Sequence, residues 1–237
     1  QWILFQRILF KKSPAKNPIY GSIETIKKIS KQDILDYYSK YYIANNLILT
    51  VVGDVDVTII KDIENAFKNF KKKDIEEKLF ETEPEHNAIE IIKTILGSGM
   101  SSRLFNEIRI KRGLAYTIGV QYEANIDFAF FSVYLSTDKK NIDEAKKIIL
   151  EEFKKIQDIS DKELEDAKNF LEGQYILELE DSHRRADVLG FWELVGYSKL
   201  SDDYIKNLKK VTKEDVKQIA NKYFHDNYCL IILEQKD

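Results

Sequence analysis

Residues 30–50, SKQDILDYYSKYYIANNLILT, align without a gap with residues 212–232, TKEDVKQIANKYFHDNYCLII. Five of the 21 aligned positions are identical. Each copy begins with Ser or Thr followed three residues later by Asp, the pattern of a helix capping box. An amphipathic stretch, an aromatic pair, a polar turn with Asn and an apolar run follow. We interpret the pair as an internal duplication of a helix followed by a strand.

The duplication predicts two related units, the first of them truncated. The first copy of the repeat has far fewer residues before it than the second copy has. Gly and Pro number only 9 and 3, so no flexible linker marks a boundary. We expect residues 1–73 to be the end of a first domain and residues 74–237 to be a second domain of similar fold.

Hydrophobic periodicity and capping signals predict an α+β chain. Helices are expected over residues 21–29, 30–42, 59–70, 88–96, 102–111, 141–157, 160–180, 183–196 and 212–224. Strands are expected over 47–52, 114–122, 128–135 and 229–233, with a turn at 125–127. We expect an antiparallel-rich sheet with helices packed on it, and we place Cys229 in the core because it lies in an apolar run.

Composition excludes several classes of protein. With 43% hydrophobic residues the chain can bury a core, which excludes disorder. The formal charge of −3 argues against a nucleic-acid partner, and no apolar run is long enough to span a membrane. The single cysteine allows no internal disulfide. The chain begins at Gln1 and its only methionine is Met100, so we expect the native N-terminus to be absent and assign no compartment.

Three chemical patterns in the sequence do not indicate a site. His86, His183 and His225 have no partner at the spacing of a zinc motif, so no metal site is expected in this chain. The adjacency of Asp181, Ser182 and His183 does not indicate a catalytic triad, since a triad is assembled from distant segments. The glycines at 97 and 99 follow a helical pattern without the lysine of a phosphate loop, and are interpreted as the end of a helix.

Arg109 and Tyr116 flank a turn at Gly113, one at the end of a helix and the other at the start of a strand. Both side chains can donate hydrogen bonds to a single carbonyl or oxyanion. Residue chemistry alone favours the alternative, a surface arginine and a half-buried tyrosine.

Residues 97–116, GSGMSSRLFNEIRIKRGLAY, resemble the second-domain signature of the M16 peptidases, the insulinase/pitrilysin-like family that includes mitochondrial processing peptidase. Residues 18–21, 30–42, 45–47 and 52–54 resemble the later part of the first domain of that family, and residues 211–224 resemble the end of the second. Nearly the whole chain is covered. The resemblance implies two related α/β-sandwich units of the LuxS/MPP-like type.

The resemblance also implies a divided active site. The family's zinc motif, H-x-x-E-H, lies in its first domain and is not present in this sequence. Zinc is therefore expected in the complete protein and none in this chain. By motif, Arg109 would hold the substrate backbone and Tyr116 would stabilise the tetrahedral oxyanion. The partners implied are a peptide substrate, which the family pairs with an edge strand, and the missing zinc-bearing domain or a partner subunit, in a homo- or heterodimer.

Two functions follow from the resemblance. The first is the C-terminal portion of a zinc metalloendopeptidase that hydrolyses peptides in a closed chamber. The alternative is a non-catalytic partner or scaffold subunit that binds peptides without cleaving them. The presence of both Arg109 and Tyr116 favours the first, and the chain alone is predicted to be inactive. One departure from the family pattern is that the opening strands of the second domain are not visible between Lys78 and Asn87.

Overall fold

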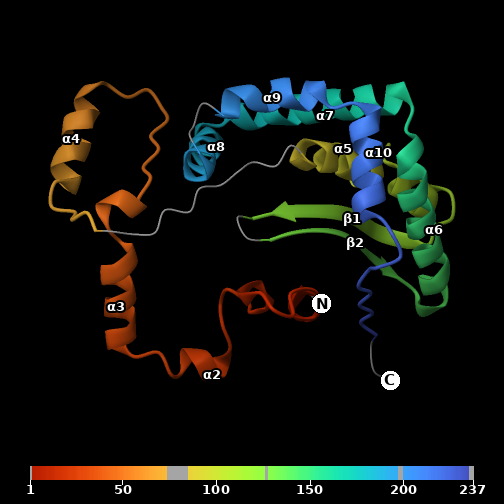
Figure 1. The fold of residues 1–237 in the computed structure, drawn as a ribbon, viewed down its shortest axis with the longest axis horizontal. Helices are drawn as coiled ribbons and strands as arrows, with labels where there is room; N and C mark the ends of the chain where they lie inside the picture. The colour runs from red at the N-terminus through yellow and green to blue at the C-terminus, as the bar shows by residue number, and fades with distance from the viewer. Residues whose placement is uncertain (1, 74–84, 126–127, 197–199, 235–237) are drawn as a thin grey trace. The chain divides into compact units, whose positions relative to one another are not determined.

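The computed structural model describes residues 2–73, 85–125, 128–196 and 200–234 (Figure 1). The chain divides into two compact units, which are described separately. Unit 1 comprises Gln1–Phe80 and Leu179–Ser201, and unit 2 comprises Glu81–Glu178 and Asp202–Asp237. The domain boundary after residue 73 stays a prediction.

Unit 1 is helical in the part that the structure describes. Its helices are α1 (Trp2–Leu9), α2 (Ile23–Ile26), α3 (Lys31–Tyr41), α4 (Thr58–Phe67) and α8 (Ser182–Val195), with short 3₁₀ turns at Pro14–Lys16 and Ala44–Asn46. Ile43 and Val195 are the buried apolar residues among those described in this unit. Most of the apolar side chains of unit 1 are therefore exposed to solvent.

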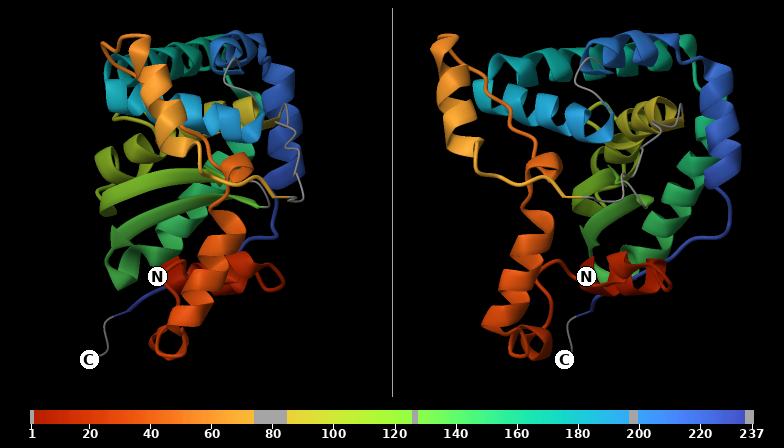
Figure 2. Two further views of the ribbon diagram at one scale, coloured as in Figure 1. Left: turned by 90° about the vertical axis from the view of Figure 1, so that its left-hand side faces the viewer. Right: turned by 60° about the vertical axis from the view of Figure 1, so that its left-hand side comes forward.

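Unit 2 combines helices with an antiparallel ribbon, which confirms the α+β prediction. Its helices are α5 (Glu85–Gly97), η3 (Phe105–Ile110), α6 (Ile142–Lys155), α7 (Asp161–Glu180), α9 (Leu200–Lys210) and α10 (Lys213–Tyr223). Short 3₁₀ turns lie at Lys139–Asn141 and Ile156–Asp158. Strands β1 (Ala115–Ala124) and β2 (Ala129–Thr137) pair antiparallel. Figure 2 shows the ribbon with the helices of this unit beside it.

The hydrophobic core lies in unit 2. Ile91, Ile92 and Leu96 of α5 are fully buried, and Val120 of β1 packs against the same cluster. Gly97 lets α5 approach β1 closely, because a Cβ at this position would lie 2.2 Å from Val120 Cγ2. Phe131 of β2 contacts the rings of Phe153 and Phe224, which brings α6 and the end of α10 onto the ribbon.

The helical half of the repeat is confirmed in both copies. Helices α3 and α10 each have 11 residues and begin with a capping box, Ser30 with Asp33 and Thr212 with Asp215. Of the other predicted helices, the one at residues 102–111 is a π-helix over most of its length, and the rest differ at their ends. Helices α1 and α9 were not predicted.

Two predicted strands are wrong. Residues 47–52 and 229–233 carry no strand assignment. An extended segment becomes a strand only when its backbone pairs with another, and neither segment pairs with a strand among the described residues. Cys229 is correspondingly exposed and not in the core.

Two further predictions fall on residues outside the described ranges. The predicted turn at 125–127 includes residues 126 and 127, which are not described. Residues 74–84 are not described either, and they make up most of the stretch between Lys78 and Asn87.

No described helix combines the length and the hydropathy that crossing a membrane requires.

Candidate functional site

Arg109 lies in a stretch of π-helix. Residues Phe105–Ile110 have this wider helical geometry, and the N–H of Lys111 donates to the carbonyl of Asn106, five residues back, at 2.9 Å. Ile108 anchors the turn because it is fully buried in the core. Single π-helical turns are rare and occur frequently at functional sites, since they change the direction in which a side chain leaves the helix.

Tyr116 lies in a β-bulge at the start of β1. Ala115 pairs with Thr137 and Thr117 pairs with Ser136, so Tyr116 is the extra residue on its strand. A bulge bends the strand and re-aims the side chain of the extra residue. Tyr116 is 80% exposed although Ala115 beside it is buried. The bulge thus projects the phenol away from the core.

The structure brings Arg109 and Tyr116 into contact. The guanidinium carbon of Arg109 lies 4.5 Å from the centroid of the Tyr116 ring and 5.0 Å from that of the Phe105 ring. Gly113, with a positive φ of 60°, makes the turn that returns the chain from the helix to the strand. The two aromatic rings hold the cation by cation–π attraction and leave its N–H groups free to donate.

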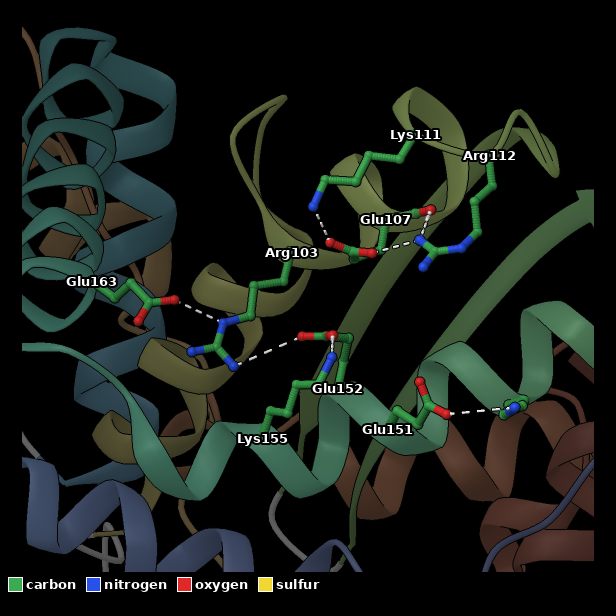
Figure 3. A network of polar contacts seen from close by, with 9 residues as sticks. Arg103, Glu107, Lys111, Arg112, Glu151, Glu152, Lys155 and Glu163 are labelled. Atoms are coloured by element: carbon green, nitrogen blue, oxygen red, sulfur yellow. Dashed lines mark hydrogen bonds and ion pairs between the residues drawn. The ribbon is translucent and has the colours of Figure 1, made fainter.

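The neighbouring cations are all paired with acids (Figure 3). Arg103 donates from Nε to Glu163 at 2.7 Å, and its Nη1 lies 3.8 Å from Glu152. Lys111 and Arg112 both bind the carboxylate of Glu107. Arg109 differs from them because it has no acidic partner among the residues that the structure describes.

These ion pairs shift two carboxyl pKa values. Hydrogen bonds from Lys111 and then Arg112 lower the pKa of Glu107 to about 2. Partial burial alone would raise the pKa of Glu163, but hydrogen bonds from Arg103 and Ser160 outweigh it and lower this pKa to about 2. Both acids are therefore ionised at neutral pH, and between them they bind Arg103, Lys111 and Arg112 but not Arg109.

The described residues do not form a zinc site. Across the described ranges, no three His, Cys, Asp or Glu side chains lie close enough together to hold a metal ion. His86 is within 3.3 Å of the Tyr122 hydroxyl, and its pKa is lowered mainly by burial. His183 faces Asp187 on the exposed surface of α8. No catalytic step through a metal is assigned to residues of this chain.

A family model described as the peptidase M16 inactive domain matches residues 28–91 and 77–171. The chain belongs to this family. The M16 assignment confirms the resemblance carried by residues 97–116.

The curated relatives include proteins named zinc proteases and one named a non-peptidase homolog. The chain is 26% identical to an uncharacterised zinc protease, YmxG, of Bacillus subtilis, over 91% of this chain and 60% of the relative. It is 24% identical to a protein of Helicobacter pylori named a non-peptidase homolog, over 97% of this chain and 62% of the relative. The chain therefore spans about 60% of the length of these relatives.

A solved structure has the same fold. The crystal structure of the peptidase M16 inactive domain from Pseudomonas fluorescens superposes with a TM-score of 0.79, covering 93% of this chain and 61% of that one. The sequences are 21% identical, so this likeness concerns the fold alone.

Sequence reasoning placed Arg109 and Tyr116 on either side of a turn but missed the two backbone irregularities that aim them. The periodicity of residues 102–111 fits an α-helix and a π-helix about equally over so short a stretch. The residue type of Tyr116 does not predict the bulge. Gly113 is the one residue that marks the change of direction.

Proposed function

We propose that this chain is the peptide-binding and oxyanion-stabilising part of an M16 zinc metalloendopeptidase. The observation that carries the proposal is Arg109, held over the Tyr116 ring and without an acidic partner among the described residues. A cation kept on aromatic rings, while the cations beside it are paired with acids, remains available for a polar ligand.

The two side chains have complementary roles in this proposal. The guanidinium of Arg109 donates hydrogen bonds to a backbone carbonyl of the bound peptide, which fixes the position of the scissile bond. The hydroxyl of Tyr116, on an 80% exposed side chain, donates to the oxygen that gains negative charge when the carbonyl is attacked. A donor of this kind lowers the barrier because its stabilisation is strongest in the transition state.

In this proposal the remaining chemistry comes from residues outside this chain. The relatives named zinc proteases are longer than this chain, and the sequence contains no H-x-x-E-H motif. Zinc, when bound in the complete protein, supplies the activated water. We propose that a zinc-bearing domain or partner subunit completes the site, in a homo- or heterodimer, around a peptide substrate.

A second candidate function is a non-catalytic subunit that binds peptides without cleaving them. Two names favour it: the family model is described as an inactive domain, and the Helicobacter pylori relative is named a non-peptidase homolog. In this function Arg109 would still hold a peptide backbone, but Tyr116 would stabilise no developing charge.

Kinetics of the complete native protein separate the two candidates. In a peptidase, Arg109→Ala raises KM about tenfold, and Tyr116→Phe lowers kcat by about a hundredfold, as removal of an oxyanion donor does in other hydrolases. Arg112→Ala is the matched control, because its guanidinium is paired with Glu107 in the same segment. Absence of both zinc and hydrolysis in the parent would support the non-catalytic subunit instead.

A further inference from the structure

Phe105 is the first residue of the π-helical stretch that carries Arg109. Its ring centroid lies 5.0 Å from the guanidinium carbon of Arg109, within the range of cation–π attraction. The two residues are four positions apart, a spacing that places side chains on the same face of a helix. This contact therefore lies within one element, whereas the contact between Arg109 and Tyr116 joins two elements across the turn at Gly113.

The backbone that carries Phe105 is anchored on both sides. Leu104 before it and Ile108 after it are fully buried in the core. The side-chain amide of Asn106 donates from Nδ2 to the carbonyl of the buried Ser102 at 3.0 Å. The ring of Phe105 consequently projects from a backbone whose position does not depend on Arg109.

Arg109 needs a support of this kind. Its side chain is long and flexible, and no carboxylate holds it among the residues that the structure describes. An unsupported arginine loses rotamer entropy when a ligand orders it, and this loss weakens binding. The face of an aromatic ring matches the planar guanidinium and uses none of its N–H groups. A guanidinium already held on a ring can therefore bind a carbonyl at a smaller entropic cost.

The side chain of Phe105 has no polar atom, so it cannot itself form a hydrogen bond with a peptide. We propose that Phe105 is a positioning residue, which holds the guanidinium of Arg109 in the orientation that receives a backbone carbonyl of the bound peptide. This inference rests on the proposed function, because it takes a peptide as the ligand of Arg109. It leaves the hydroxyl of Tyr116 available for a separate role.

The test is a double-mutant cycle on peptide affinity in the complete native protein. The probe is a fluorescein-labelled, unstructured peptide with neutral side chains, and a zinc chelator prevents its cleavage during the titration. Phe105→Leu keeps an apolar side chain but removes the ring, and it should weaken binding about fivefold. In the Arg109→Ala background the same change should weaken binding less than about twofold, because the ring has no guanidinium left to hold.

Two control variants separate the role of the ring from general packing. Phe105→Tyr keeps the aromatic face and should bind the peptide within about twofold of the parent. Phe153→Leu removes a ring that packs on Phe131 and Phe224 in the same unit. It should lower the melting temperature but change peptide affinity less than about twofold. Circular dichroism verifies that each variant is folded.

Three results would overturn the inference: unchanged affinity in Phe105→Leu, an equal loss in the parent and Arg109→Ala backgrounds, or failure of Phe105→Tyr to retain affinity. The second result would mean that Phe105 contacts the peptide directly or acts through the fold. Failure of the proposed function has a different signature, because Arg109→Ala would then bind the peptide as tightly as the parent, or the parent would bind none. In either case the inference fails together with the function on which it rests.

Discussion

Arg103, Arg109 and Arg112 lie within ten residues of one another but have different surroundings. Arg103, which lies just before η3, is paired with Glu152 of α6 and Glu163 of α7, and its side chain is only 18% exposed. Arg112 binds Glu107 at the surface. Arg109 contacts aromatic rings. One segment therefore contains a structural arginine, a surface ion pair and a cation packed on aromatic rings.

Arg103→Ala should destabilise the chain by about 2 kcal/mol, because it removes the bond to Glu163 of α7 and one of the two cations paired with the buried Glu152, the other being Lys155. Urea unfolding measures the change. Arg112→Ala should cost much less stability than Arg103→Ala, since its pair is at the surface. Equal losses in the two variants would contradict the structural role assigned to Arg103.

The Glu163 carboxylate predicts a loss of stability in acid. Its folded pKa, about 2, is below the ordinary value of 4.5, so its ionised form stabilises the fold above about pH 4.5. This contribution is lost as the pH falls from about 4.5 to about 2. The free energy of unfolding of Glu163→Gln should depend less steeply on pH over this range than that of the parent. The pH dependence that remains in the variant should come in part from Glu107. An unchanged profile would contradict the assignment.

At the scale of the element, the contact between α5 and β1 depends on Gly97. Alanine there would place Cβ 2.2 Å from Val120 Cγ2 and 2.4 Å from Val120 Cβ. Because the clash reaches atoms next to the backbone, rotation of the valine side chain cannot relieve it. The helix and the strand would have to separate.

Gly97→Ala should therefore destabilise the chain by about 2 kcal/mol, since overpacking outweighs the better helix propensity of alanine. Gly173→Ala is the matched control, because Gly173 lies inside α7 and a Cβ there meets nothing within 4 Å. That variant should be stabilised by about 0.5 to 1 kcal/mol. Thermal unfolding of both variants provides the test, and stabilisation by Gly97→Ala would refute the close packing.

Local signals in the sequence predicted the helices well and the isolated strands badly. The capping boxes at Ser30 and Thr212 identified helix starts because the box is formed within four residues. The apolar runs 47–52 and 229–233 were predicted as strands from composition, but strand formation needs a distant partner. Helix α9 was missed despite apolar residues at helical spacing. In the site, the pairing of Arg109 with Tyr116 was predictable, whereas their stacking depends on two irregularities without a local signal.

At the scale of the whole molecule, the chain matches only part of the length of its relatives. It spans about 60% of its zinc protease relatives and carries the Arg109–Tyr116 pair without a described cluster of metal ligands. The M16 fold is thus present with the Arg109–Tyr116 pair, which we propose holds a peptide.

The purified 237-residue chain, loaded with zinc salts, should therefore hydrolyse no peptide. Its sequence has no H-x-x-E-H motif to supply zinc ligands and a general base. A panel of unstructured fluorogenic peptides measures this directly, with chelator-treated chain as the control for contaminating proteases. Zinc-dependent cleavage that co-purifies with the chain would refute the prediction.

The unequal burial of α3 and α10 has a calorimetric consequence. The heat-capacity increment of unfolding arises mainly from apolar surface that becomes hydrated, and it averages about 12–15 cal/mol/K per residue in globular proteins. The apolar side chains of α3 are already hydrated in the folded state, whereas those of α10 are not. Melting of this chain should therefore give a per-residue increment below that average, and nearly all of the excess heat should come from unit 2.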